Sequence, residues 1–238
     1  MKRSTALLVL LVAFAGHACR NQSSVFASSN ALGANEQLAR YVTARSAEAD
    51  SIPTERRAEL RKLAGVVRES LEDRDAARLL FVCTHNSRRS QMAQIWARVA
   101  AAHSGIDNVE VFSGGTESTA FNPRAVDALE RAGFAIVRTE QSDNPVYRVS
   151  IGADNTLDCW SKEFGDPTHP NDEFIAIMTC SEADRSCPFV PGAAHRIAMT
   201  YEDPKAFDGS AREQAAYDER CAQIAREMLL TFRFVNED

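Results

Sequence analysis

A cysteine directly follows an apolar run in the stretch RLLFVCTHNSRRSQMAQIWARV, residues 78–99. After Cys83 comes a polar loop, and Arg89 and Ser90 stand at the start of a helical pattern. Backbone N–H groups of such a loop can surround an anion, and the positive end of a helix favours the thiolate form of a cysteine. Arg89 offers a planar fork for two oxygens of a tetrahedral oxyanion, and Ser90 can hydrogen-bond the sulfur when it leaves. The stretch therefore predicts a cysteine nucleophile beside its own oxyanion-binding loop.

The predicted oxyanion-binding residues are Thr84, His85, Asn86, Ser87, Arg88, Arg89 and Ser90. As a bare pattern, Cys-x5-Arg is frequent by chance, and a buried cysteine after a strand is most often a core residue. The functional interpretation therefore depends on the elements around the loop and on partners further along the chain.

Two further cysteines stand in MTCSEADRSCPFVP, where Cys180 ends a predicted strand and Cys187 follows seven residues later. Ser181 and Asp184 have the spacing of a capping box, which predicts a short helix that Pro188 ends. Seven residues of helix separate two α-carbons by about 10 Å, whereas a disulfide needs roughly 5.5–6 Å. A disulfide between these two cysteines therefore requires the segment to unwind. The alternative is that they are two core cysteines that flank a turn.

Strand and helix patterns alternate after residue 75. The predicted strands are residues 79–82, 109–113, 174–179 and 196–199. The predicted helices are residues 89–103, 123–132 and 210–234. This alternation predicts an α/β fold of three layers, with a four-stranded parallel sheet and helices on both faces. Ligands of such sheets bind at the carboxyl ends of the strands, where Cys83 and Cys180 are both predicted to lie.

Three further segments accompany the strand–helix units: an N-terminal helical extension, a tether before it and an insertion within the domain. Residues 36–75 carry a helical pattern and predict an N-terminal helical extension that packs on the main domain, residues 76–235. Residues 20–35 are rich in Ser, Asn and Ala and are typical of a tether. Residues from about 142 to 172 fit no strand–helix unit and are interpreted as a long insertion.

Residues 1–19 have the pattern of a secretory signal: Lys2 and Arg3, then an apolar core from Ala6 to Ala15, then small residues. Cys19 suits a lipid anchor, although Gly16 is unusual three residues before such a cysteine. The pattern predicts export, to the periplasm or as a membrane-anchored lipoprotein. The alternative is a start site assigned too far upstream, in which case the protein would be cytoplasmic.

The composition of the chain bears on its domain number and argues against several classes of binding site. The 238 residues are 45% hydrophobic and 25% charged, which suits one globular domain with an appended segment. The net charge of −6 argues against a general nucleic-acid-binding surface, so that an anion site must be a local basic pocket. Six cysteines without a Cys-x-x-Cys pair and five scattered histidines predict neither a disulfide scaffold nor a metal site.

The motif CTHNSRRS, followed by QMAQIWA, resembles the phosphate-binding loop of the low-molecular-weight protein tyrosine phosphatases. It is still more similar to that of the thioredoxin-coupled arsenate reductases, which share their fold. The resemblance runs from about Leu79 to Phe232 and includes FSGGTES, FNPRAVDALERAGF and MTCSEADRSCP. It implies the low-molecular-weight phosphatase fold, no tightly bound cofactor, and electrons from thioredoxin or another dithiol.

The resemblance also implies residue roles. An Asp directly before Pro acts as the general acid in this family, and YEDPKAF supplies Asp203. In the reductases three cysteines form a relay, which here implies that Cys83 attacks arsenate, Cys180 attacks Cys83, and Cys187 attacks Cys180. Cys221 is interpreted as a core residue and Cys159 as a spare thiol.

Three positions depart from the family pattern. His85 replaces a loop glycine and is expected to adopt a left-handed conformation or to add positive charge to the site. Arg88 replaces a frequent cysteine. Gln94 stands where some arsenate reductases place a potassium-binding glutamate, so no metal is predicted.

The sequence leaves two alternatives beside arsenate reduction. Phosphatases of this family usually place aromatic residues after the Asp-Pro pair, whereas Lys205 and Ala206 follow it here, which favours a small inorganic oxyanion. A phosphotyrosine or other phosphomonoester phosphatase remains the alternative enzyme, with an aromatic wall built from Tyr147, Trp160 and Phe164 of the insertion. A surface protein that only binds phosphate or arsenate is the non-enzymatic alternative.

Overall fold

A computed structural model of the chain describes residues 35–74, 76–152 and 155–237. The predicted signal segment, its Cys19 and nearly all of the predicted tether lie outside these ranges. In the part of the chain that is described, no helix is both long and apolar enough to span a membrane.

Four parallel strands form the central sheet, in the order β2-β1-β6-β7. Their bounds are Ala77–Cys83 for β1, Val109–Gly115 for β2, Phe174–Met178 for β6 and Ala193–Ala198 for β7. All five residues of β6 and six of the seven in β1 are buried, because a central parallel strand is covered on both faces. The predicted four-stranded parallel sheet is confirmed, with β7 beginning three residues before its predicted start.

Helices cover both faces of this sheet. On one face α4 (Arg89–His103) packs against β1, β2 and α7 (Glu213–Val235), while α5 (Pro123–Ala132) packs on α7. On the other face lies the short α6 (Ser181–Ser186), which contacts β1 and β6. Consecutive residues of β1 alternate between two hydrophobic clusters: Phe81 belongs to the large one, and Leu80 and Val82 to the smaller one beneath α6.

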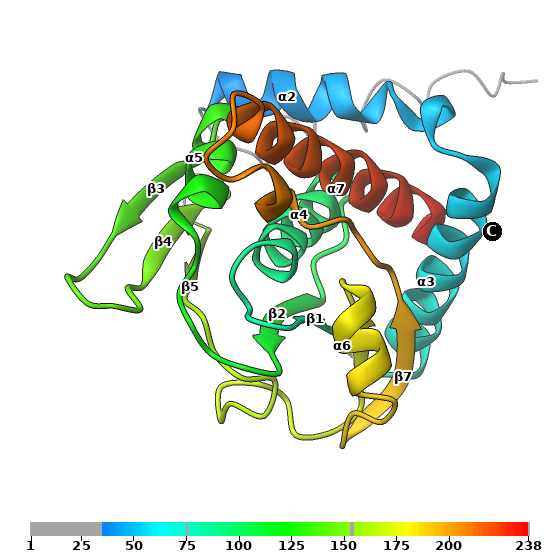
Figure 1. Cartoon of the computed structure of the whole chain (residues 1–238). Helices are drawn as coiled ribbons and strands as arrows, with labels where there is room; N and C mark the ends of the chain where they lie inside the picture. Colours follow the sequence, from blue (N-terminus) through cyan, green and yellow to red (C-terminus); the bar gives the residue numbers. More distant parts are fainter. Residues whose placement is uncertain (1–34, 75, 153–154, 238) are drawn as a thin grey trace, which may run out of the picture.

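The helical pattern before the domain corresponds to α2 (Glu36–Ser46), a 3-10 turn η1 (Ala49–Ser51) and α3 (Thr54–Asp73). Both helices pack against α7, and Figure 1 shows α2 running alongside it. The apolar stripe of α3, which includes Leu60, Leu63 and Val67, is fully buried. Burial of this stripe holds the extension on the domain, because apolar area removed from water is the main favourable term in packing.

Residues 142–172, interpreted as an insertion that fits no strand–helix unit, contain two short strands. Strands β4 (Tyr147–Ser150) and β5 (Thr156–Cys159) join β3 (Ala135–Arg138), which the sequence patterns also missed, in an antiparallel sheet of order β3-β4-β5. Each strand has only four residues, and β3 has no buried residue, so the local pattern is too short and too polar to indicate a strand. This small sheet projects to one side of the domain (Figure 1).

Candidate active site

Cys83 is the last residue of β1, and its loop leads directly into α4. The Sγ atom of Cys83 lies 3.1 Å from Ser90 Oγ, which accepts a hydrogen bond of 2.8 Å from Asn86 Nδ2. Since the Ser90 oxygen accepts this bond, its own proton is available to the sulfur. A hydroxyl so placed can donate a hydrogen bond to a sulfur that carries negative charge.

The carbonyl groups of the loop are directed away from its interior. Thr116 N–H donates to Cys83 O at 3.2 Å, and Glu117 N–H donates to Thr84 O at 2.9 Å. The carbonyl of His85 accepts from the hydroxyls of neighbouring segments. A loop whose carbonyl oxygens face outward is suited to hold an anion within it.

The left-handed position of the loop is Asn86, with φ 45°, and the expectation that His85 adopts this conformation was wrong. Asn tolerates this region better than most side chains. Asn86 is fully buried, and its Oδ1 accepts from Lys162 N at 3.0 Å and from Gln91 Nε2 at 3.0 Å. His85 is instead half exposed, with Nε2 3.7 Å from Glu117 Oε2.

Gly115 fits against the loop so closely that a side chain has no room. It is the register partner of Cys83 in the sheet. A β-carbon at this position would lie 2.7 Å from Thr84 O and 2.8 Å from Asn86 N. No role was predicted for Gly115, although the Gly114-Gly115 pair at the end of β2 was a usable signal for close backbone approach.

Two arginines bring the predicted acid to the loop. Arg89 Nη2 lies 2.8 Å from Asp203 Oδ2, and Arg88 Nη1 lies 3.6 Å from the same oxygen. Arg89 Nη1 also donates to Tyr201 O at 3.0 Å, and Arg88 Nε donates to Tyr217 OH at 3.1 Å. One pocket is therefore lined by the predicted nucleophile, loop and acid, namely Cys83, His85, Ser87, Arg88, Arg89 and Asp203.

Asp203 also acts locally in the Asp-Pro pair. It caps the 3-10 turn η2 (Pro204–Phe207), with Oδ1 accepting from Lys205 N at 3.1 Å. One carboxylate oxygen thus fixes the turn while the other faces Arg88 and Arg89. The Asp203 side chain therefore both caps the turn and faces the predicted oxyanion loop.

The helix expected between Cys180 and Cys187 is confirmed as α6, but its N-cap is Cys180 and not Ser181. The Cys180 sulfur accepts from Ala183 N–H at 3.3 Å, and Cys187 is the C-cap residue. Thr84 Oγ1 lies 3.5 Å from the same sulfur. Cys83, Cys180 and, at its edge, Cys187 all belong to the smaller hydrophobic cluster. The five cysteines within the described residues are all free thiols.

Residues 160–162 of the insertion contact the loop and the start of α4 from outside. Trp160 O accepts from Gln91 Nε2 at 2.7 Å, and Ser161 Oγ donates to His85 O at 2.9 Å. Together with the bond from Lys162 N to Asn86, these contacts join residues 160–162 to the loop. Sequence reasoning missed them, since no motif marks a main-chain contact between distant segments.

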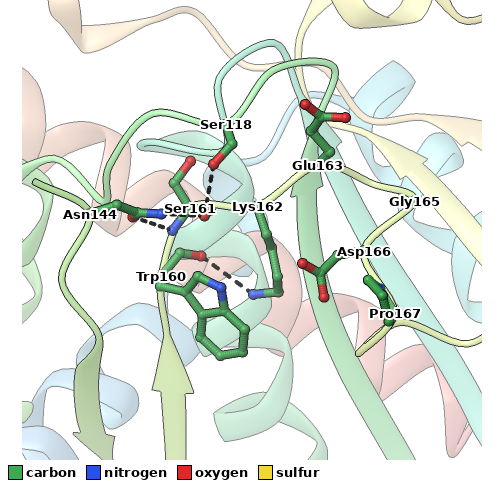
Figure 2. Close-up of a pocket in the computed structure, with 9 residues that line it drawn as sticks. All are labelled: Ser118, Asn144, Trp160, Ser161, Lys162, Glu163, Gly165, Asp166 and Pro167. Atoms are coloured by element: carbon green, nitrogen blue, oxygen red, sulfur yellow. Dashed lines mark hydrogen bonds between the residues drawn. The ribbon is translucent and has the colours of Figure 1, made fainter.

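A cavity of about 500 Å³ lies beside residues 160–162 (Figure 2). The Lys162 ammonium stands 3.8 Å from the centre of the Trp160 ring, and burial lowers the pKa of Lys162. The lining residues are Ser118, Asn144, Trp160, Ser161, Lys162, Glu163, Gly165, Asp166 and Pro167.

The aromatic wall considered for the insertion is not formed at the Cys83 pocket. The ring of Tyr147 packs edge-on against Phe121, and Phe164 packs on the smaller hydrophobic cluster. Trp160 lines the cavity beside Lys162 instead. The residues that line the Cys83 pocket include no phenylalanine, tyrosine or tryptophan.

The remaining thiols lie in the interior. Cys221 is buried on α7 as expected, accepts from Trp96 Nε1 at 3.3 Å, and has its pKa raised to about 12 by burial. Cys159 is buried at the end of β5, and burial raises its pKa to about 12 as well. Gln94 Nε2 donates to Val111 O at 3.1 Å. Among the described residues no group of three or more His, Cys, Asp or Glu is arranged to hold a metal ion.

Comparison with known proteins agrees with the geometry. The family model described as low molecular weight phosphotyrosine protein phosphatase matches residues 78–147. An arsenate reductase of Bacillus licheniformis is 30% identical over 159 residues, which are 67% of this chain and 96% of that protein. Arsenate reductase 2 of Staphylococcus epidermidis is 29% identical over 130 residues, 55% of this chain and 80% of that protein.

Among solved structures, that of an arsenate reductase from Archaeoglobus fulgidus has a TM-score of 0.42 and 20% identity, and the match covers 67% of this chain and 99% of that one. The sequence relationship to the Bacillus licheniformis protein spans nearly all of that relative. The chain is therefore an enzyme of the low molecular weight phosphotyrosine protein phosphatase family, related in sequence to arsenate reductases.

Proposed function

We propose that this enzyme reduces arsenate to arsenite, with Cys83 as nucleophile and with Cys180 and Cys187 as a disulfide relay. The observation that carries the proposal is the position of the three thiols. Cys83 ends β1, Cys180 lies two residues after the neighbouring strand β6, and Cys187 closes the six-residue helix that Cys180 opens. A phosphomonoester hydrolase needs Cys83 for turnover, and Cys180 would then only protect an oxidised Cys83.

In the first step the thiolate of Cys83 attacks the arsenic atom. A sulfur–arsenic bond forms, an arsenic–oxygen bond breaks, and a proton from Asp203 lets the oxygen leave as water. Arg89 stands between loop and acid, since its Nη2 lies 2.8 Å from Asp203 Oδ2. Arsenate competes with Asp203 for this guanidinium, so that binding of the oxyanion frees the carboxyl group for proton transfer.

In the second step the thiolate of Cys180 attacks the sulfur of Cys83. A disulfide bond forms, and the sulfur–arsenic bond breaks with its two electrons left on arsenic, which departs as arsenite. The approach is short because Thr84, the chain neighbour of Cys83, already contacts the Cys180 sulfur at 3.5 Å.

In the third step the thiolate of Cys187 attacks the sulfur of Cys180, and Cys83 leaves as a thiolate next to Ser90 Oγ. The ends of α6 must approach one another, because about 10 Å of helix exceeds the roughly 6 Å of a disulfide. The helix has six residues, so that few backbone hydrogen bonds are lost when it unwinds. The Cys180–Cys187 disulfide is then reduced by thioredoxin or by another dithiol.

The polar lining of the pocket supports a small inorganic substrate. Arg88 and Arg89 supply two positive charges beside Cys83, and no phenylalanine, tyrosine or tryptophan lines the pocket to stack on a phosphotyrosine ring. We further propose that the signal-like residues 1–19 direct export from the cytoplasm. The electron donor would then be a dithiol protein of the compartment to which the enzyme is exported.

Two parallel assays of the purified protein test the proposal. One follows NADPH oxidation with arsenate, thioredoxin and thioredoxin reductase, and the other follows hydrolysis of an aryl phosphate. We expect arsenate turnover that is lost in Cys83→Ser and in Cys187→Ser. Aryl phosphate hydrolysis that needs Cys83 but is unaffected by Cys187→Ser, together with no arsenate turnover, would assign a phosphatase instead.

A further inference from the structure

We propose that Arg56, in the helical extension, is a positioning residue for the active site. Its guanidinium holds the acid segment, defined here as residues 200–203, which carries Asp203 and a main-chain acceptor for Arg89. This inference rests on the proposed role of Asp203 and Arg89, and it makes the extension part of the catalytic unit and not only a cover for α7.

Arg56 lies near the start of α3 and reaches across to the domain. Its Nε and Nη2 atoms lie 2.9 Å and 2.8 Å from Glu227 Oε2 on α7. Its Nη1 lies 2.7 Å from Glu59 Oε2 on its own helix. The remaining contacts go to the acid segment: Nη2 donates to Thr200 O at 3.4 Å, and the guanidinium carbon lies 4.9 Å from the centre of the Tyr201 ring.

Arg89 holds the same segment from the active-site side. Arg89 Nη1 donates to Tyr201 O at 3.0 Å, and Nη2 pairs with Asp203 at 2.8 Å. Tyr201 N donates to Thr179 O at 3.1 Å, which fixes the segment beside the end of β6. Tyr201 thus has its ring against Arg56 of the extension and its carbonyl on Arg89 of the loop. A shift of this one residue moves both the guanidinium that binds oxyanion and the carboxyl that transfers the proton.

The buried carboxylate of Glu227, next to the acid segment, depends on Arg56 as its ion-pair partner. The side chain of Glu227 is 3% exposed, and its other oxygen accepts from Gln223 Nε2 at 3.0 Å. Burial raises the pKa of Tyr201 well above its usual value, so that its ring stays neutral beside this carboxylate. Without Arg56, Glu227 is a buried carboxylate that has lost its ion-pair partner, and the surrounding chain rearranges to solvate it.

Arg68 provides a matched control on the same helix. Its guanidinium also joins α3 to α7, through the carbonyls of Phe234 and Val235 at the far end of α7. Loss of Arg68 therefore weakens the docking of the extension but leaves the contacts of the acid segment in place. A purely structural role for Arg56 predicts that the two substitutions have the same effect on catalysis.

The test compares the full chain with Arg56→Gln, Arg68→Gln, and the double variant Arg56→Gln/Glu227→Gln, which removes the unpaired carboxylate and so protects folding. For each we would measure Tm, kcat and KM for arsenate, and the protection that inorganic phosphate gives Cys83 against alkylation. Displacement of catalytic groups by about 1 Å can cost on the order of 100-fold, so we expect both Arg56 variants to lose roughly tenfold or more in kcat. Phosphate protection should weaken in the same two variants, whereas Arg68→Gln should change Tm alone.

Two results would overturn the inference. One is a double variant that is folded and retains wild-type kcat and phosphate protection. The other is an equal loss of kcat in Arg68→Gln and Arg56→Gln. Failure of the proposed function is distinct, since the wild type would then show no arsenate turnover. Phosphate protection, or aryl phosphate hydrolysis, would still report whether Arg56 positions Arg89 and Asp203.

Discussion

The hydroxyl oxygen of Ser90 lies 3.1 Å from the sulfur of Cys83, and the amide of Asn86 donates to that same oxygen. The three side chains form a chain of hydrogen bonds in which the Ser90 hydroxyl can donate to the sulfur. Ser90 can therefore stabilise negative charge on the sulfur of the proposed nucleophile when Cys83 attacks and when it leaves.

Ser90→Ala should slow the release of Cys83 more than the binding of substrate. A hydrogen bond to a charged group contributes about 1.5–3 kcal/mol, so we expect kcat to fall roughly 10- to 100-fold with little change in KM. Quenched mass spectrometry should show the Cys83–Cys180 disulfide accumulating. Ser51→Ala serves as the control, since the Ser51 hydroxyl belongs to the N-terminal extension and donates to Glu48 O at 2.6 Å. Equal losses in the two variants would argue against this role.

Gly115→Ala should displace the oxyanion loop. The added β-carbon would press on Thr84 O and Asn86 N, and a displacement of about 1 Å can cost on the order of 100-fold in rate. Gly65→Ala is the matched control, because a β-carbon there meets nothing within 4 Å in helix α3. That control should keep full activity and gain about 0.5–1 kcal/mol in stability. Retention of activity in Gly115→Ala would contradict the geometry.

Arg196→Gln should make the Cys180–Cys187 disulfide harder to reduce. In the dithiol form Arg196 clamps α6, with Nε 2.9 Å from Cys187 O and Nη2 2.6 Å from Asp184 Oδ1. Loss of the clamp destabilises the reduced state by about 1.5–3 kcal/mol, which lowers the reduction potential by roughly 30–60 mV. A glutathione redox titration measures this shift. Arg148→Gln, which breaks the exposed pair with Asp158, should leave the potential unchanged.

Lys162→Met should alter how stability depends on pH. Burial lowers the pKa of Lys162, so the unfolded chain binds a proton more tightly than the folded chain does. The free energy of unfolding of the wild type should therefore gain from this group as pH rises from the lowered pKa toward about 10.5, the usual value. The gain should be absent in Lys162→Met. Denaturant titrations of both proteins at neutral pH and at about pH 10 give the change in the free energy of unfolding between the two pH values. An equal change in the wild type and in Lys162→Met would exclude the effect.

The chemistry-bearing residues could be identified from the sequence because their signals are local. An apolar run, a polar loop and helix-start residues placed Cys83 at a strand end, and α4 has the predicted bounds, Arg89–His103. Gly133 ends α5 as expected, in the left-handed conformation that favours glycine. Each of these features depends on neighbours within one or two turns of chain, which sequence periodicity reports directly.

Only the tertiary structure decided how that site is supported. The left-handed residue is Asn86 and not His85, because Asn86 is bonded to Gln91 and to residue 162 of the insertion. Hydrogen bonds from the insertion to the loop join residues that are 76 positions apart in the sequence, and the bond from Arg56 to the acid segment joins residues 144 positions apart. Such contacts leave no periodic trace in the sequence, since they arise from main-chain carbonyls and single side chains that meet only when the sheet and helices have packed. The sequence by itself determined the proposed nucleophile, its loop and the sheet beneath them, and packing determined which contacts hold them in place.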